Sequence, residues 1–192
     1  MVRLIIGSAA AAVAMFVLGF LLYATPLSRL GYASLSNEQA AAVQQAMAAN
    51  LPRTGTYAVP GMDTAEQTNM YSRGPIATVH YNTDGFAATD PAMLAGGLVF
   101  YFVVALIIGL ALIGIDRRVP DFPSRAKLVI AFAVAASALL HLSEPIFYRH
   151  DWGHFIYLFI ADAILLAAGG LVIARWFLAK ADAAMPGAPT DV

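Results

Sequence analysis

Three ionisable side chains stand inside otherwise apolar stretches of the chain: His141 and Glu144 in one stretch, and Asp162 in the next. A charged side chain at the centre of a bilayer costs about 2.5–3.5 kcal/mol by insertion scales, so such residues usually face the interior of a helix bundle. His141 lies seven residues from the end of its stretch at Tyr148, and Asp162 lies eight residues from His154 at the start of the next. At 1.5 Å per residue both depths are about 10–12 Å. We therefore expect His141 and Asp162 to form an intramembrane polar pair across two neighbouring helices.

Further polar residues surround this pair. Ser137 precedes His141 by four residues and Glu144 follows it by three, so these residues share one face of a helix. The short connection to the next stretch adds three more candidates: His150, Asp151 and His154. Two histidines separated by four residues are compatible with one metal ion. Three interpretations stay open: a structural hydrogen bond, a proton or ligand path, and a metal site.

The composition places these residues in a membrane protein. Of 192 residues, 60% are hydrophobic and 12% are charged, about half the charged share of an ordinary soluble domain. Four runs are long enough to cross about 30 Å of hydrocarbon as helices: residues 4–24, 93–115, 128–148 and 155–178. The predicted fold class is a membrane all-α protein, a four-transmembrane-helix bundle with a small α+β exported domain between helices 1 and 2.

The expected domain boundaries follow from these runs. Residues 1–25 form an uncleaved anchor, because no Ala-x-Ala pattern precedes Thr25-Pro26. Residues 26–90 form the exported domain, residues 91–180 hold the other three spans, and residues 181–192 form a disordered cytoplasmic tail. Close helix packing is expected at the alanine-rich third span and at Gly169-Gly170.

Basic residues predict the orientation. Seven of the eleven fall on one side: Arg3, Arg117, Arg118, Arg125, Lys127, Arg175 and Lys180. Four of these lie in the short loop between spans two and three, and short loops weigh most in the positive-inside rule. Both termini are therefore expected in the cytoplasm and residues 26–90 in the periplasm of a bacterium, with the chain in the inner membrane.

The exported segment has its own local signals. Ser36-Asn37-Glu38-Gln39 is typical of a capping box and predicts an amphipathic helix that ends near Asn50. Residues 54–59 and 76–81 are expected to be short strands, and residues 62–74 a mobile loop. Such a segment buries too little apolar area to fold alone, so it is expected to depend on a partner or on the membrane.

The sequence also resembles an uncharacterised family of small four-span bacterial inner-membrane proteins. The resemblance rests on Ser36-Asn37-Glu38-Gln39-Ala40, Leu51-Pro52, Gly55-Thr56-Tyr57, Pro60, Arg73-Gly74-Pro75, Trp152-Gly153, Ala161-Asp162 and 170–175. It covers nearly the whole chain and implies the same topology and a bacterial source, with no catalytic residue to carry over. The chain departs from the family at Asp151-Trp152-Gly153-His154-Phe155, where an aromatic Trp-Tyr-Gly-Phe-Pro stretch is expected.

Two classes of function follow. No nucleophile elbow, phosphate-binding loop or metalloprotease motif occurs, and the chain has no cysteine. The first hypothesis is a non-enzymatic accessory, assembly or docking subunit of a larger membrane complex. The expected partners of this subunit are the bilayer and either other membrane protein subunits or further copies of this chain. The second is a small transporter or metal-handling protein built on the His, Asp and Glu cluster. Nucleic acid is not expected as a partner, because the formal charge is −1. No cofactor is predicted, and a metal ion remains the alternative.

Overall fold

The computed structural model describes residues 1–87 and 89–178, and it is mostly helical. Four helical segments are long and apolar enough to cross a membrane. They are α1 (Val2–Tyr23), α4 (Pro91–Ile115), α5 (Phe122–His141) continued by α6 (Ser143–Phe147), and α7 (Trp152–Trp176). The prediction of four apolar spans is confirmed in this coarse form. The predicted disordered tail lies outside the described residues.

Short-range signals set the ends of these helices. Asp121 precedes α5 and accepts a hydrogen bond of 2.9 Å from the backbone N–H of Ser124, which satisfies one of the free donors of the first turn. Asp151 caps α7 in the same way, with its Oδ2 2.8 Å from the N–H of His154. The sequence predicts Asp151 as part of a proton or ligand path, whereas in the structure its carboxylate caps α7.

The third span is interrupted near its end. The sequence predicts one helix over residues 128–148, whereas α5 ends at His141 and α6 begins at Ser143. Pro145 explains the break, because its ring has no N–H and clashes with the carbonyl four residues earlier, at His141. His141 therefore sits at the end of a helix.

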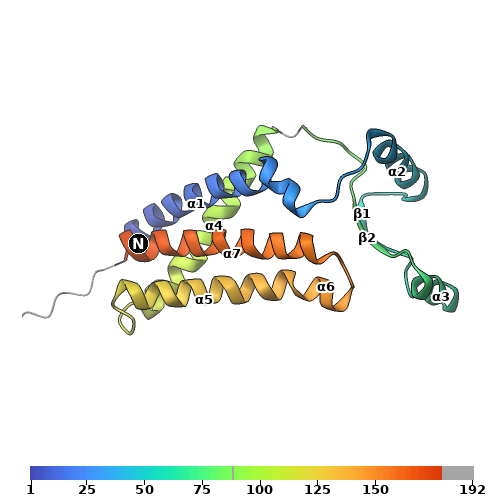
Figure 1. The fold of residues 1–192 in the computed structure, drawn as a ribbon. Coiled ribbons are helices and arrows are strands. Elements are labelled where there is room, and N and C mark those ends of the chain that lie inside the picture. The colour runs from blue at the N-terminus through green and yellow to red at the C-terminus, as the bar shows by residue number, and fades with distance from the viewer. Residues whose placement is uncertain (88, 179–192) are drawn as a thin grey trace, which may run out of the picture. The chain divides into compact units, whose positions relative to one another are not determined.

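Two glycines let α7 pack against a helix on either side. α7 lies between α1 and α5, and α4 crosses behind it (Figure 1). A Cβ atom built on Gly169 would lie 2.5 Å from Met15 Sδ of α1, and one on Gly170 would lie 2.6 Å from Val129 Cγ1 of α5. The close packing expected at Gly169-Gly170 is confirmed.

The loop between α4 and α5 is held by a buried arginine. Arg125 is only 3% exposed, and its Nε donates to the carbonyl of Val119 at 2.7 Å while its NH2 group lies 3.4 Å from the carbonyl of Asp116. Arg125 counted as one of the basic residues that predict the orientation. In the structure it also fixes the loop.

A short 3₁₀ helix, η1 (Pro26–Gly31), follows α1 and packs against α7. It belongs to the same compact unit as the four spans, a unit of Met1–Ala33 and Pro91 onward. Gly31 permits the contact, since a Cβ there would lie 2.8 Å from the Tyr157 ring. The start of the segment expected to be exported thus contacts the spans.

The second compact unit, Ser34–Asp90, contains two helices and a two-stranded sheet. These are α2 (Asn37–Asn50), β1 (Gly55–Val59), α3 (Ala65–Arg73) and β2 (Ala77–Tyr81). The strands are antiparallel, with Gly55 opposite Tyr81 and Val59 opposite Ala77. The predicted capping box is present: the Ser36 hydroxyl accepts from the N–H of Gln39, and Gln39 Oε1 accepts from the N–H of Ser36.

The expectation of a mobile loop over residues 62–74 is wrong. Most of that stretch forms α3, which begins after Thr64, whose hydroxyl accepts from the N–H of Gln67 at 3.1 Å. It ends at Gly74, which has a φ of 67°, a conformation that glycine adopts without strain. The cap residues at both ends were visible in the sequence, and the lack of apolar periodicity between them concealed the helix.

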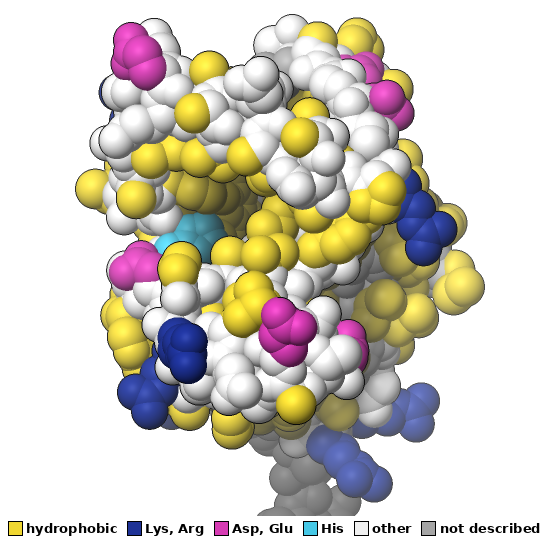
Figure 2. All heavy atoms as spheres, turned by 90° about the vertical axis from the view of Figure 1, so that its right-hand side faces the viewer, with side chains coloured by type: hydrophobic (Ala, Val, Ile, Leu, Met, Phe, Trp, Pro, Cys, Tyr) yellow, Lys and Arg dark blue, Asp and Glu magenta, His cyan; other side chains and the backbone are white. Residues whose placement is uncertain are grey.

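None of the described residues of Ser34–Asp90 is buried. The predicted amphipathic helix, α2, accordingly has no buried face. Six apolar side chains of this unit are 45–68% exposed: Leu35, Val43, Val59, Met62, Met70 and Phe86. Figure 2 shows hydrophobic side chains at the surface on the face that it presents. As far as its residues are described, the unit has secondary structure but no hydrophobic core.

Candidate intramembrane polar site

His141 of α5 and Asp162 of α7 lie in contact across the helix interface. The distance between His141 Nε2 and Asp162 Oδ2 is 2.7 Å. The side chains are 16% and 34% exposed, respectively. If the carboxylate is ionised it accepts this bond, so the imidazole carries a proton on Nε2. Asp162 is ten residues from the start of α7, about 15 Å along the axis at 1.5 Å per residue.

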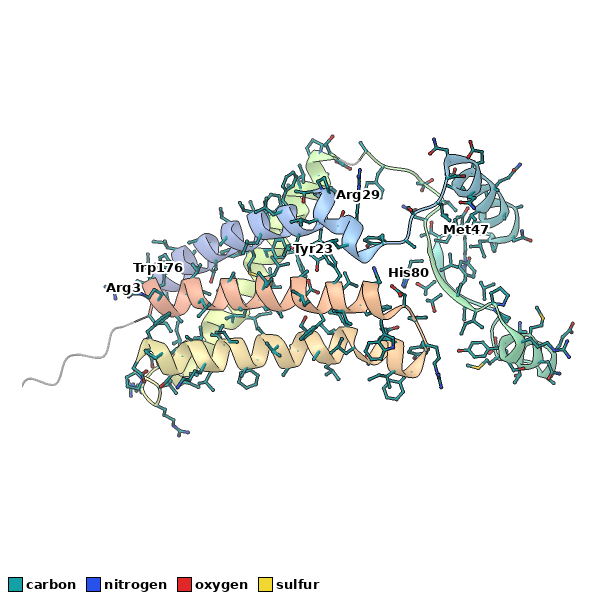
Figure 3. The ribbon with its side chains drawn as sticks, in the orientation of Figure 1. Arg3, Tyr23, Arg29, Met47, His80 and Trp176 are labelled. Atoms are coloured by element: carbon teal, nitrogen blue, oxygen red, sulfur yellow. The ribbon has the colours of Figure 1, made fainter. Side chains whose placement is uncertain are left out.

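A third side chain, which the sequence reasoning missed, completes this site. The hydroxyl of Tyr23, the last residue of α1, donates to Asp162 Oδ1 at 2.5 Å. Figure 3 shows Tyr23 pointing from α1 toward α7. A tyrosine at the end of an apolar run is typical of the membrane interface, so its type and position alone gave no sign of this role.

The polar site therefore comprises Tyr23, His141 and Asp162, from three different helices. One carboxylate accepts a hydrogen bond on each oxygen, and the bonds join α1 and α5 to α7. The core of a bilayer contains no water that could replace these hydrogen-bond partners. Such bonds therefore favour the helix arrangement in which every polar atom of the site has a partner.

Ser137 lies near the polar site but has a different partner. Its side chain is fully buried, and its hydroxyl donates to the carbonyl of Phe159 on α7 at 2.8 Å. This bond fixes α5 to α7 one turn before His141. The sequence predicts Ser137 as part of a proton or ligand path, whereas in the structure its hydroxyl binds a backbone carbonyl.

Glu144 and His150 form a separate pair. Glu144 Oε2 lies 3.2 Å from His150 Nδ1. The His150 ring is stacked with the rings of Tyr148 and Phe155, with centroid distances of 5.7 and 5.6 Å. This pair closes the connection between α6 and α7, and no hydrogen bond among the described residues links it to His141.

His154 contacts the segment that follows α1. Its Nδ1 donates to the carbonyl of Gly31 at 2.6 Å, and Tyr32 meets its ring edge-on at 4.8 Å. One turn further along α7, the Tyr157 hydroxyl donates to the carbonyl of Leu22, one of the carbonyls left free at the end of α1. Both bonds attach the end of α1 and η1 to α7.

The structure does not bring the two loop histidines together as metal ligands. His150 and His154 each direct Nδ1 to a different partner. Within the described residues, no group of three or more His, Asp or Glu side chains could hold a metal ion.

The comparisons with known proteins add no assignment: no family model, no curated protein and no solved structure matches this chain. The resemblance to a four-span bacterial family stays a prediction. Four apolar helices are compatible with an integral membrane protein.

Proposed function

We propose that this protein is a non-enzymatic docking or assembly subunit of a larger bacterial inner-membrane complex. Both termini would lie in the cytoplasm and the unit Ser34–Asp90 in the periplasm. The observation that carries the proposal is the absence of any buried residue in the described part of that unit. An α+β unit without a core gains little from apolar burial to offset the loss of chain entropy.

Its charge favours a protein partner over the membrane surface. The unit holds two arginines against five carboxylates, a formal charge of −3 with histidine neutral. Anionic lipid headgroups would repel such a unit, whereas a protein surface can cover its apolar side chains. The exposed side chains of Val43 on α2, Met70 on α3 and Phe86 supply the apolar contacts.

The polar site supports a structural role for the spans. Each oxygen of Asp162 has a partner within the chain, and the bonds tie α1, α5 and α7 together. The spans would then act as a stable anchor that presents the docking unit to the partner.

The experiment compares hydrogen exchange of the full-length protein in native membranes and after purification in mild detergent. Backbone amides of β1 and β2 should be protected in membranes and exchange faster once the partner is removed. Val43→Glu and Met70→Glu should remove the protection in membranes. Gln44→Glu and Thr68→Glu, at exposed polar positions of the same helices, are the matched controls. Equal protection in both preparations, unchanged in the two apolar variants, would refute the docking role.

A second candidate function is a proton path through the polar site, and one observation favours it. Nδ1 of His141 has no hydrogen-bond partner in the part of the chain that the structure describes. A histidine that binds a carboxylate through Nε2 and has a free Nδ1 can accept a proton on one side and release it on the other. Proton flux into vesicles that contain the purified protein, lost in His141→Leu and retained in Ser137→Ala, would support this candidate.

A further inference from the structure

The spans leave an apolar groove between α4 and α5, with a volume of about 430 Å³. We call it the α4/α5 groove. Its lining is entirely apolar and includes Ile108, Ile115, Leu128, Phe132, Ala136 and Leu166. Leu112, Val129 and Ala133 form its buried floor. A groove with this lining offers a water molecule no polar partners, so its occupant should be apolar.

The length of the groove suggests what that occupant is. Its lining runs from Ile115 back to Ile108 on α4 and from Leu128 to Ala136 on α5, about 10–12 Å at 1.5 Å per residue. A hydrocarbon core of about 30 Å gives each leaflet about 15 Å. The groove therefore extends over one leaflet and stops, which suits one acyl chain better than a helix that crosses the whole bilayer.

The end of the groove carries positive charge. Arg117 and Arg118 follow Ile115 by two and three residues, and Lys127 immediately precedes Leu128; all three are exposed. None of them has an ion-pair partner among the described residues. Asp116 and Asp121 lie in the same loop, and Asp121 caps α5. With Arg125, the loop has a formal charge of +2.

We propose that the α4/α5 groove binds one acyl chain of an anionic phospholipid, whose phosphate lies against Arg117, Arg118 and Lys127. The apolar groove and the unpaired cations meet at the level where a phospholipid changes from chain to headgroup. Arginine suits this position because its planar guanidinium makes bidentate hydrogen bonds to phosphate oxygens. The site does not depend on the docking role of the unit Ser34–Asp90.

The test is lipid binding to the delipidated full-length protein in mild detergent, measured by native mass spectrometry. Phosphatidylglycerol and phosphatidylcholine with identical acyl chains are the two probes. One phosphatidylglycerol should bind per chain, about 25-fold more tightly than phosphatidylcholine. Both lipids carry a phosphate, but only phosphatidylglycerol has a net negative charge, and each of the two net positive charges of the loop adds roughly a factor of five for it. Arg117→Gln with Arg118→Gln should lower phosphatidylglycerol binding to the level of phosphatidylcholine.

Filling the groove tests the acyl chain separately. Ala111→Trp on α4 and Ala136→Trp on α5 each place an indole in the groove and should abolish binding of both lipids. Val134→Trp, on an exposed position of α5 outside the groove, and Arg149→Gln, at an exposed position beyond the other end of α5, should change neither.

Three results would overturn the proposal. Equal binding of the two lipids to the unchanged protein would contradict the preference for an anionic phospholipid. Unchanged phosphatidylglycerol binding in both tryptophan variants would place the lipid elsewhere. A dimer without lipid that Ala136→Trp dissociates would assign the groove to a second copy of the chain.

Discussion

Tyr23 and Asp162, 139 positions apart in the chain, are joined by a hydrogen bond of 2.5 Å from the phenol hydroxyl to Oδ1. Because Oδ2 of the same carboxylate meets His141, Asp162 is shared by two donors from different helices. Any substitution of Asp162 therefore affects the contacts of α7 with both α1 and α5. The polar pair predicted from matched depth becomes a three-helix site.

The first prediction concerns the stability of this site. Asp162→Leu should lower the free energy of unfolding by about 1–3 kcal/mol, because it leaves the Tyr23 hydroxyl and the His141 imidazole without a hydrogen-bond acceptor among apolar side chains. Asp162→Asn should cost less, since the amide oxygen still accepts one bond. His141→Leu with Asp162→Leu should recover only part of the loss, and adding Tyr23→Phe should recover more. Thermal unfolding in mild detergent, followed by the fluorescence of Trp152 and Trp176, measures these differences.

The control for this series is Tyr148→Phe. Tyr148 is exposed, and its hydroxyl makes no hydrogen bond within the described residues, so the variant should unfold like the unchanged protein. Equal stability of the double leucine and the triple variants would contradict the expected cost of leaving the Tyr23 hydroxyl without its acceptor.

The sequence could predict the contact between α5 and α7 but not the contribution of α1. His141 and Asp162 lie on spans joined by a short connection, so their depths can be compared by counting residues. Tyr23 lies on a span separated from α7 by more than a hundred residues, and nothing in the sequence sets which helix α1 touches. The residue spacing places Ser137 on the same helix face as His141, but its partner is a backbone carbonyl, which no residue pattern reveals.

The second prediction concerns the contact of α7 with α1. Gly169→Leu should destabilise the protein by about 1–3 kcal/mol, because the added side chain meets Met15 in a filled interface. Gly114→Leu on α4 is the matched control, since a Cβ there has no heavy atom within 4 Å. The same unfolding measurement applies. Equal stability of both variants would mean that α1 and α7 are not closely packed.

Local sequence signals predicted the secondary structure correctly where hydrophobic residues repeat regularly or where a helix begins with a clear capping motif. The four spans, the Ser36 capping box and the two strands all follow from such signals. The errors fall at α3, whose few apolar residues show no helical periodicity, and at Pro145, where one residue divides a span. The small size of the unit Ser34–Asp90 already suggests that it buries little apolar area. Which of its apolar residues are exposed could be seen only in the tertiary structure.

The third prediction is a pH dependence at the start of α5. The N–H of Ser124 donates to Asp121, which lowers the pKa of that carboxyl from its ordinary value near 4. A group with a lowered pKa in the folded state stabilises that state above the unfolded pKa, and loses the effect as the pH falls through the folded pKa. The Ser124 amide resonance should therefore titrate below pH 4 in an NMR experiment. Asp121→Asn keeps the cap without the charge and should abolish the titration; a shift that survives this change would belong to another group.

The fourth prediction concerns the unit Ser34–Asp90 in isolation. A polypeptide of residues 34–90 should show no cooperative thermal transition by circular dichroism and little dispersion of its amide resonances, because none of its described residues is buried. Residual helix in α2 is expected from its capping box. A sharp unfolding transition in water would show that the unit needs no partner.

The last prediction is the topology. The chain has no cysteine, so single substitutions label one site each, and Asn69→Cys and Pro120→Cys occupy exposed positions in Ser34–Asp90 and in the α4–α5 loop. The excess of basic residues in that loop predicts a cytoplasmic position for Pro120→Cys and a periplasmic one for Asn69→Cys. An impermeant maleimide added to intact cells whose outer membrane has been made permeable should label Asn69→Cys at once, and Pro120→Cys only after the inner membrane is broken. The reverse order would invert the orientation and place the unit Ser34–Asp90 in the cytoplasm.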